Sequence, residues 1–86
     1  MKDFCVEFFI IGECNKGERA NSPKHSCYEI IYYLNGVGMS VIEDKNYEFK
    51  ENTFAVVRPD TAHYEQHYTG TQVLCIGFHC PPDVTL

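Results

Sequence analysis

The chain has no tryptophan, no cluster of basic residues and no long apolar run. Its 7 Lys and Arg residues are outnumbered by 12 Asp and Glu residues, and the formal net charge is −5. Because phosphate contacts need a basic face, this composition excludes nucleic-acid binding through the surface of this chain itself. The apolar run from Phe8 to Ile11 is too short for a signal peptide or a membrane span. We therefore expect a cytoplasmic protein with no membrane segment.

Paired cysteine motifs are also missing. The 5 cysteines are odd in number and none forms a C-x-x-C pair. A secreted disulfide framework would more often show an even set, so the pattern favours free thiols in a reducing compartment. The chain also lacks a Gly-rich phosphate loop and a Ser-His-Asp pattern. None of these chemistries is predicted, and no cofactor is expected.

Tyr, Phe, Val and Ile dominate the apolar residues, and they recur with a period of two, which favours strands over helices. The chain of 86 residues is long enough for one small domain, residues 1–86, of a size that oligomerisation commonly stabilises. Turn signals about every ten residues predict seven or eight short strands in an all-β antiparallel sandwich or barrel. The expected strands cover residues 5–11, 28–34, 37–43, 47–49, 53–57, 63–68 and 72–79, and residues 12–24 are expected to form a loop. Asn35-Gly36 is an expected turn, and Glu43-Asp44-Lys45-Asn46 is an expected hairpin turn.

One strand face combines polar and apolar residues. If residues 25–33 form a strand, His25, Glu29 and Tyr33 share a face with Cys27 and Ile31. Buried polar groups normally bind each other, a metal or a ligand, because burial without a partner is costly. The opposite face, Tyr28, Ile30, Tyr32 and Leu34, is expected to face outward and to mediate self-association.

A second polar face lies in the segment from His63 to Tyr68, where His63, Glu65 and His67 alternate onto one side. Glu65 is expected to face solvent, because charged residues in short strands usually do.

The spacing of five residues matches a known motif. Gly17, Pro23, His25, Glu29 and Gly36 follow the pattern of the first motif of the cupin superfamily, except that Pro23 stands where the family has its first histidine. The segment from Arg58 to His63 loosely resembles the second cupin motif, with His63 as its histidine.

The sequence between these motifs resembles that of the N-terminal sensor domain of AraC-type transcription regulators. The similar segment is HSCYEIIYYLNGVGMSVIEDKNYEFKENTFAVVRPDTAHYEQHY, and the resemblance covers about residues 15–82. It implies a small cupin-like (double-stranded β-helix) barrel that binds a small effector or mediates dimerisation. It also implies that DNA binding resides in a C-terminal helix-turn-helix domain that this chain lacks. The chain is therefore expected to be an isolated sensor domain, the N-terminal fragment of a longer regulator, with a small free-standing cupin as the alternative.

The resemblance raises the question of a metal, because cupin enzymes commonly hold a transition metal with three histidines and one glutamate. If any metal is bound, His25, Glu29 and His63 are the matching ligands, with His67 or Cys27 as a substitute fourth. Two histidines and a carboxylate can bind Fe(II). The competing interpretation is a hydrogen-bonded polar cluster, which is preferred because proline cannot be a ligand.

The sequence thus predicts a non-enzymatic sensing and dimerisation domain. Its expected ligand-binding residues are His25, Glu29, Tyr33 and His63. The expected partners are a small effector, with a sugar or an organic acid as the guess, and a second copy of the chain. Two alternatives stay open: a small metal-dependent cupin enzyme, such as a dioxygenase or sugar isomerase, and a barrel that only dimerises.

Overall fold

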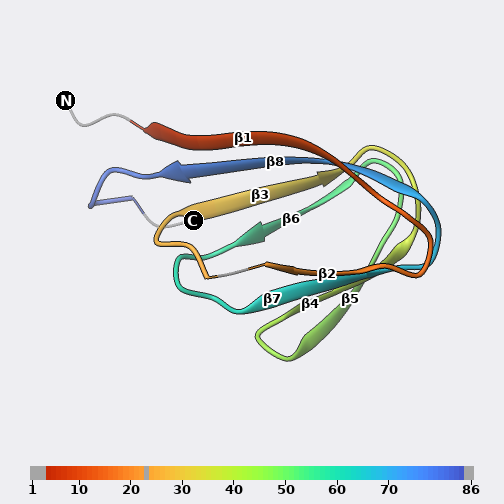
Figure 1. The fold of residues 1–86 in the computed structure, drawn as a ribbon. Coiled ribbons are helices and arrows are strands. Elements are labelled where there is room, and N and C mark those ends of the chain that lie inside the picture. Colours follow the sequence, from red (N-terminus) through yellow and green to blue (C-terminus); the bar gives the residue numbers. More distant parts are fainter. Residues whose placement is uncertain (1–3, 23, 85–86) are drawn as a thin grey trace.

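The structure is a computed structural model, and it describes residues 4–22 and 24–84. Within these residues the chain forms eight strands and no helix (Figure 1). The strands are β1 (Cys5–Cys14), β2 (Arg19–Ser22), β3 (Tyr28–Tyr33), β4 (Gly38–Ile42), β5 (Lys45–Phe49), β6 (Thr53–Val57), β7 (His63–His67) and β8 (Thr71–His79). The predicted all-β class is confirmed, and no helix of the described chain is long and apolar enough to cross a membrane.

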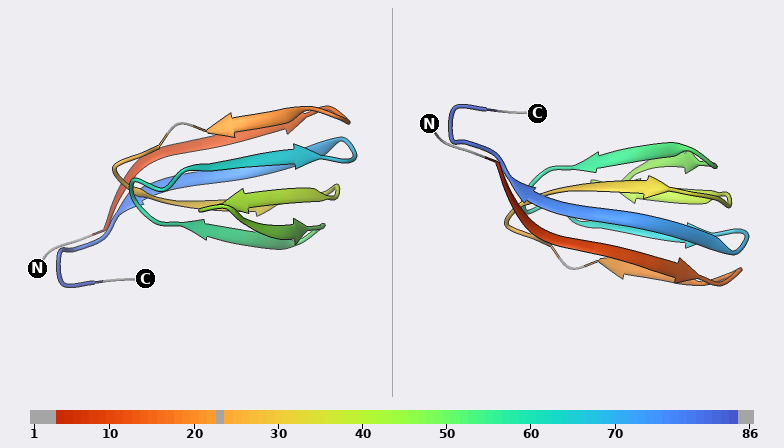
Figure 2. Two further views of the ribbon diagram at one scale, coloured as in Figure 1. Left: turned by 90° about the horizontal axis from the view of Figure 1, so that it is seen from below. Right: turned by 90° about the horizontal axis from the view of Figure 1, so that it is seen from above.

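The strands form two antiparallel sheets of four strands that face each other (Figure 2). One sheet has the order β1-β8-β3-β6 and the other the order β2-β7-β4-β5. Chain neighbours such as β3 and β4 therefore lie in different sheets, so the connecting turns cross from one layer to the other. Alternate residues of each strand then point into the space between the sheets.

The backbone conformation at two turns agrees with the predicted turn positions. Glu43 and Asp44 both have positive φ, 50° and 64°, and they join Ile42 of β4 to Lys45 of β5 as a two-residue hairpin loop. Positive φ at both central positions is typical of the type I′ turn, whose twist matches that of paired strands. Gly36, with φ 86°, makes the predicted turn after β3, where a side chain would strain the backbone.

The largest differences from the prediction lie in the first third of the chain. β1 continues through Gly12 to Cys14, because β8 pairs with it along its length from Cys5↔His79 to Cys14↔Thr71. Residues 19–22, expected as loop, form β2, which pairs with β7 from Arg19↔Gln66 to Ser22↔His63. β3 begins at Tyr28 as expected, so the alternative of one strand over residues 25–33 is wrong, and His25 and Cys27 precede the strand.

The core lies between the sheets. Its central cluster is made of Ile31, Tyr33, Phe49, Val57 and Val73. The rings of Tyr33 and Phe49 stack with centroids 3.9 Å apart, which joins β3 of one sheet to β5 of the other. Burial alternates along β3 as predicted, with Glu29, Ile31 and Tyr33 buried and the residues between them half-buried.

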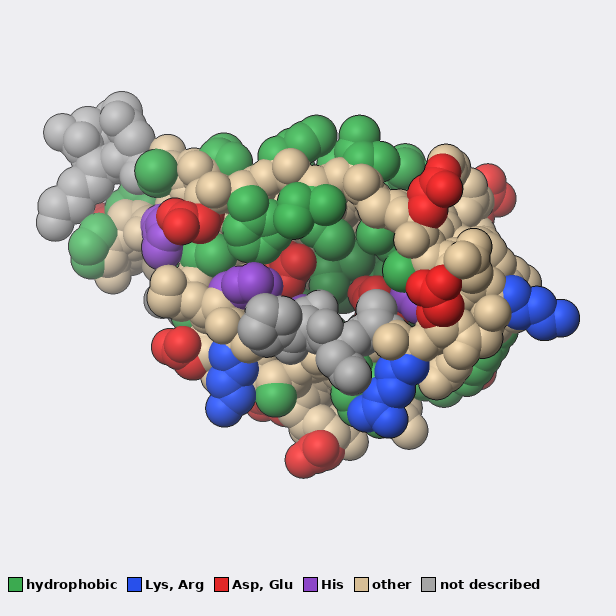
Figure 3. Space-filling model, viewed as in Figure 1, with side chains coloured by type: hydrophobic (Ala, Val, Ile, Leu, Met, Phe, Trp, Pro, Cys, Tyr) green, Lys and Arg blue, Asp and Glu red, His purple; other side chains and the backbone are tan. Residues whose placement is uncertain are grey.

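The outer face of the β1-β8-β3-β6 sheet is apolar. Cross-strand register places Phe9, Ile76, Ile30 and Val56 in one row of this face. The adjacent row contains Ile11, Leu74, Tyr32 and Phe54. Phe9, Ile11 and Phe54 expose 60%, 67% and 64% of their surface. Contiguous apolar surface of this kind is uncommon on a soluble monomer and marks an interaction site. Hydrophobic side chains gather visibly along β1 on the molecule (Figure 3).

The close approach of Gly38 to its neighbours generates a stability prediction. A Cβ at Gly38 would clash with the backbone oxygen of Gln66 and with the ring of Phe49. We expect Gly38→Ala to lower the free energy of unfolding by about 1–3 kcal/mol, the usual cost of overpacking. The measurement is urea denaturation of both proteins.

Gly12→Ala is the matched control, because its Cβ would lie an ordinary 3.6 Å from Val73 Cγ2. Alanine in a strand is more favourable than glycine by about 0.5–1 kcal/mol, so this variant should be neutral or more stable. Equal losses in both variants would contradict the packing argument.

Candidate functional site

Glu29 of β3 and His63 of β7 meet between the sheets. His63 Nε2 lies 3.1 Å from Glu29 Oε1, and both side chains are buried. The two elements belong to opposite sheets, so the fold brings together residues 34 positions apart in sequence. When His63 is protonated, the contact is a buried ion pair between an imidazolium and a carboxylate. We call this the Glu29–His63 pair.

The proton positions of the pair follow from its partners. His63 Nδ1 lies 3.2 Å from the carbonyl oxygen of Thr61, which can only accept a hydrogen bond. Nδ1 therefore carries a proton, and Nε2 faces a carboxylate that favours a second one. Interaction with Glu29 raises the pKa of His63 above its ordinary value of 6.5, although burial acts in the opposite direction. The pair thus favours an imidazolium beside a carboxylate.

His25 lies near this pair but comes from the segment before β3. Its ring is half-buried, 5.1 Å from the ring of Phe8 and 6.5 Å from that of His63, measured between centroids. The backbone N–H of Asp60 donates to the His25 carbonyl over 2.7 Å, which ties this segment to the loop that precedes His63. The prediction that His25 shares a strand face with Glu29 is therefore wrong, although the fold still brings the two histidines together.

Tyr33, the fourth predicted site residue, contacts a different carboxylate. Its hydroxyl donates to Glu65 Oε2 over 2.7 Å, and Glu65 Oε1 lies 3.2 Å from His67 Nε2. Glu65 is only 6% exposed, so the expectation that it faces solvent is wrong. The alternation of His63, Glu65 and His67 already contained the correct signal, since all three share the inward face of β7.

Ser40 of β4 completes this second group. It is the cross-strand partner of Glu65 and is 2% exposed. We call Tyr33, Ser40, Glu65 and His67 the Glu65 cluster. Burial, followed by the charge of Glu65, raises the pKa of Tyr33, so the phenol stays protonated and remains a donor. Sequence reasoning named Tyr33 but missed Ser40 and Glu65 as interior polar residues.

Buried polar atoms gather in these two groups between the sheets. Glu29 Oε1 and His63 Nε2 face each other at 3.1 Å, and Glu65 Oε1 and His67 Nε2 at 3.2 Å, so each contact sets a carboxylate against an imidazole. His67 Nδ1 is buried with no hydrogen-bond partner within the described chain. Such an atom is uncommon in folded proteins, because its desolvation is not compensated.

Comparison with known proteins identifies the family. The model of the AraC-like ligand binding domain matches residues 6–81. The chain belongs to this family. A curated relative, the uncharacterized HTH-type transcriptional regulator YfiF of Bacillus subtilis, is 32% identical over 60 residues, which are 70% of this chain and 19% of the relative. The AraC-like domain described here thus spans about a fifth of that regulator's length, and it is a sensing domain of the AraC type.

Solved structures share the fold of the AraC-like domain. A conserved protein of unknown function from Streptococcus pyogenes has a TM-score of 0.79 at 15% identity, over 94% of this chain and 68% of its own. A predicted oxalate decarboxylase from Thermotoga maritima has a TM-score of 0.77 at 17% identity. The match covers 87% of this chain and 68% of the decarboxylase. A salicylate 1,2-dioxygenase from Pseudaminobacter salicylatoxidans has a TM-score of 0.74 at 12% identity, over 78% and 19%. At these identities the likeness establishes the cupin-like fold alone.

The residues of the AraC-like domain do not fit the metal that this fold holds in enzymes. Within residues 4–22 and 24–84, no three His, Cys, Asp or Glu side chains gather closely enough to hold a metal ion. The two motif histidines keep their rings 6.5 Å apart between centroids, and Glu29 is directed at His63. Pro23, which stands in the place of the family's first histidine, lies outside the described residues.

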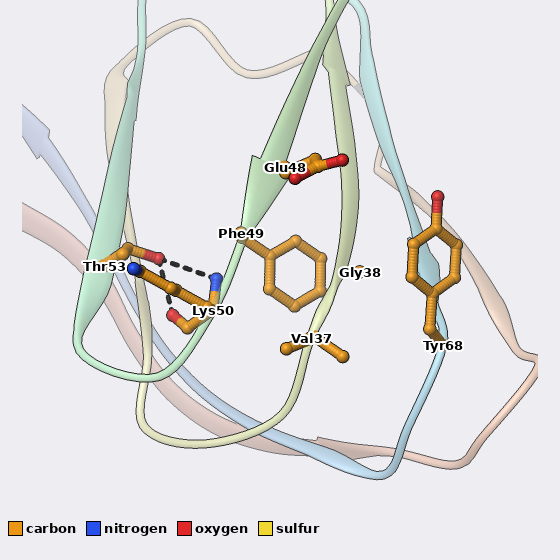
Figure 4. A pocket seen from close by; sticks show the side chains of 7 residues that line it. All are labelled: Val37, Gly38, Glu48, Phe49, Lys50, Thr53 and Tyr68. Carbon is orange, nitrogen blue, oxygen red and sulfur yellow. Dashed lines mark hydrogen bonds between the residues drawn. The ribbon is translucent and has the colours of Figure 1, made fainter.

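An open hollow of about 420 Å³ lies at one end of the domain, beside the Glu65 cluster. Val37, Glu48, Lys50, Thr53 and Tyr68 line it together with Gly38 and Phe49 (Figure 4). Phe49 is buried, and its ring also contacts the rings of Tyr33 and His67, with centroid distances of 3.9 and 5.4 Å. Phe49 therefore touches the hollow and the interior cluster at once.

The geometry of the Glu29–His63 pair generates a titration prediction. We expect the pKa of His63, followed by histidine NMR signals, to lie above 6.5 in the wild type and to fall in Glu29→Gln. Because the pKa of His63 is higher in the folded state than its ordinary value of 6.5, protonation of His63 stabilises the fold. This contribution is fully present below pH 6.5 and is lost as the pH rises through the folded-state pKa.

Glu51→Gln is the control for this titration, because Glu51 is exposed in a turn. Its His63 signal should titrate as in the wild type. A His63 pKa that is unchanged in Glu29→Gln would show that the carboxylate does not hold the proton.

Proposed function

We propose that this AraC-like domain binds a small polar effector between its two sheets, against the Glu29–His63 pair. The observation that carries this proposal is the pair itself, a carboxylate and an imidazole buried together at 3.1 Å between the sheets of a chain from a ligand-binding family. An apolar wall with a few convergent polar groups is the usual form of a small-molecule site. Val57 and Ile31 supply apolar wall beside Glu29 on the inner face of the same sheet.

The roles of the site residues follow from their chemistry. An imidazolium donates to a ligand oxygen and a carboxylate accepts from a ligand hydroxyl, so the pair fixes the orientation of a polar molecule. His25, half-buried beside Phe8, provides a further contact at the same end of the interior. Tyr33 lies deeper along β3, at Glu65. These four residues are the proposed ligand contacts.

The domain is proposed to act by binding alone and to be no enzyme. The family match, the regulator relative and the lack of a three-ligand metal group within the described chain support this. We infer that DNA binding resides in a part of the regulator outside this domain, which covers 19% of the length of the YfiF relative. A regulator of this kind would work in the cytoplasm, where both DNA and metabolites are present.

A thermal-shift screen of sugars and organic acids tests the effector site. The hit's affinity should fall by roughly ten- to a hundredfold in Glu29→Gln, since a buried hydrogen bond to a charged group contributes about 1.5–3 kcal/mol. Isothermal titration calorimetry measures it, with the exposed Glu51→Gln as the control. A hit whose affinity is unchanged by substitutions at both Glu29 and His63 binds elsewhere, which would refute this site.

The outer apolar face supports a second part of the proposal, a homodimer. Its two rows of apolar side chains cross all four strands of the β1-β8-β3-β6 sheet. The predicted outward residues of β3 lie in the middle of this face, although Tyr28, Ile30 and Tyr32 are half-buried and only Leu34 among them is exposed. A second copy would cover the more exposed residues on either side, such as Phe9 and Phe54.

Sedimentation equilibrium tests self-association. We expect the wild type to dimerise at micromolar concentration and Phe54→Glu to be shifted to monomer, because the charge would be buried in the interface. Tyr68→Glu is the control, since Tyr68 is 49% exposed but follows β7 of the other sheet. A wild type that stays monomeric at high micromolar concentration, or a dimer indifferent to Phe54→Glu, would contradict this interface.

A further inference from the structure

We propose that the open hollow at the end of the domain is a second small-molecule site, and that it binds an aromatic α-amino acid. Its volume of about 420 Å³ lies within the usual range of roughly 300–1,000 Å³ for ligand pockets. Neither Glu29 nor His63 lines the hollow. This inference therefore goes beyond the effector site proposed above and does not depend on it.

Val37 and Tyr68 form one wall of the hollow, and their backbone is held in place. Val37 precedes β4 and Tyr68 follows β7, and the N–H of Tyr68 donates to the Val37 carbonyl oxygen over 3.0 Å. The N–H of Val37 in turn donates to Thr69 Oγ1 over 3.0 Å. The side chains of Val37 and Tyr68 are nevertheless 42% and 49% exposed. This wall thus presents apolar and aromatic surface that the domain itself leaves uncovered.

Phe49 lies between the hollow and the interior of the domain. Its ring lies beside the bare backbone of Gly38 and contributes to the lining of the hollow (Figure 4). The same ring stacks on Tyr33 in the core, with centroids 3.9 Å apart, so its position is fixed. Aromatic rings attract one another in stacked or edge-to-face arrangements. A ring is therefore the apolar group that best complements a hollow bordered by Phe49, Tyr68 and Val37.

Two opposite charges border the same hollow. Glu48 belongs to β5, Lys50 directly follows that strand, and both side chains are exposed. Neither side chain forms an ion pair with any residue that the structure describes. Thr53 fixes the backbone of Lys50, because its hydroxyl accepts from the Lys50 N–H over 3.1 Å and donates to the Lys50 carbonyl oxygen over 2.6 Å (Figure 4). A carboxylate and an ammonium group are thus both available to a ligand.

These charges indicate which kind of molecule fits. A simple anion would contact Lys50 but would also meet the Glu48 carboxylate, and a simple cation would meet the Lys50 ammonium group. A zwitterion complements both, because Glu48 accepts hydrogen bonds from its ammonium group and Lys50 donates to its carboxylate. An aromatic α-amino acid combines this zwitterion with a ring.

A set of matched compounds tests each part of this ligand. L-phenylalanine carries all three groups, whereas 3-phenylpropionate lacks the ammonium group, phenethylamine lacks the carboxylate and L-alanine lacks the ring. Affinity for the wild-type domain is measured by NMR titration. We expect L-phenylalanine to bind more tightly than either charged analogue by roughly two- to fivefold, the usual effect of a solvent-exposed charge pair. L-alanine should bind more weakly still. No binding of L-phenylalanine, or equal binding of any of the other compounds, would overturn the proposed class.

Substitutions on the rim match each charge to its group on the ligand. Lys50→Gln should weaken L-phenylalanine binding by roughly two- to fivefold without weakening phenethylamine, which has no carboxylate. Glu48→Gln should weaken L-phenylalanine similarly without weakening 3-phenylpropionate. Lys45→Gln and Glu18→Gln are the matched controls, because both residues are exposed and neither lines the hollow. Equal losses for the amino acid and its analogue, or no loss in either rim variant, would overturn the proposal.

The location of the ligand separates this inference from the proposed function. We expect nuclear Overhauser contacts from the ligand ring to the Val37 methyl groups and the Tyr68 ring, and an affinity that Glu29→Gln leaves unchanged. Binding of L-phenylalanine that depends on Glu29 but not on Glu48 or Lys50 would overturn the hollow as its site and support the interior effector site. L-phenylalanine binding in the hollow supports this inference even if no effector is found for the Glu29–His63 pair.

Discussion

The structure depends on keeping two carboxylates, Glu29 and Glu65, between two sheets that are otherwise joined by apolar contact. Each carboxylate lies against an imidazole from β7, at 3.1 Å for His63 and 3.2 Å for His67. A buried charge without a partner would cost more than a small domain can supply. Side-chain contacts between β3 and β7, which lie in opposite sheets, therefore allow this fold to keep polar side chains in its core.

This constraint links stability to function. Tyr33 both stacks on Phe49 in the core and donates to Glu65, so one side chain joins the apolar cluster to the polar one. His67 Nδ1 is the ring nitrogen of the two buried imidazoles that has neither a hydrogen bond nor an ion pair within the described chain. A molecule that binds the folded domain and not the unfolded chain would stabilise the fold, so the effector proposed above should raise the melting temperature.

The sequence predicted the parts of the fold that depend on local chemistry. The alternation in β3 predicted which of its residues are buried, and Glu43-Asp44 predicted the hairpin between β4 and β5. The short, polar strand β2 could not be predicted, because its pairing with β7 is decided by tertiary contact rather than by its own residues. The extension of β1 through Gly12 has the same cause, since β8 is long enough to pair with it.

The sequence predicted part of the candidate site and missed the part that depends on tertiary contact. Motif spacing identified Glu29 and His63, which the fold brings together. A charged residue such as Glu65 is usually exposed, so only the opposing Tyr33 hydroxyl reveals why it is buried. The most direct measurement of the account is a crystal structure of the domain with the most strongly stabilising sugar or acid. The account predicts ligand oxygens within hydrogen-bond distance of Glu29 and His63. A ligand on the surface, with the interior unchanged, would contradict it.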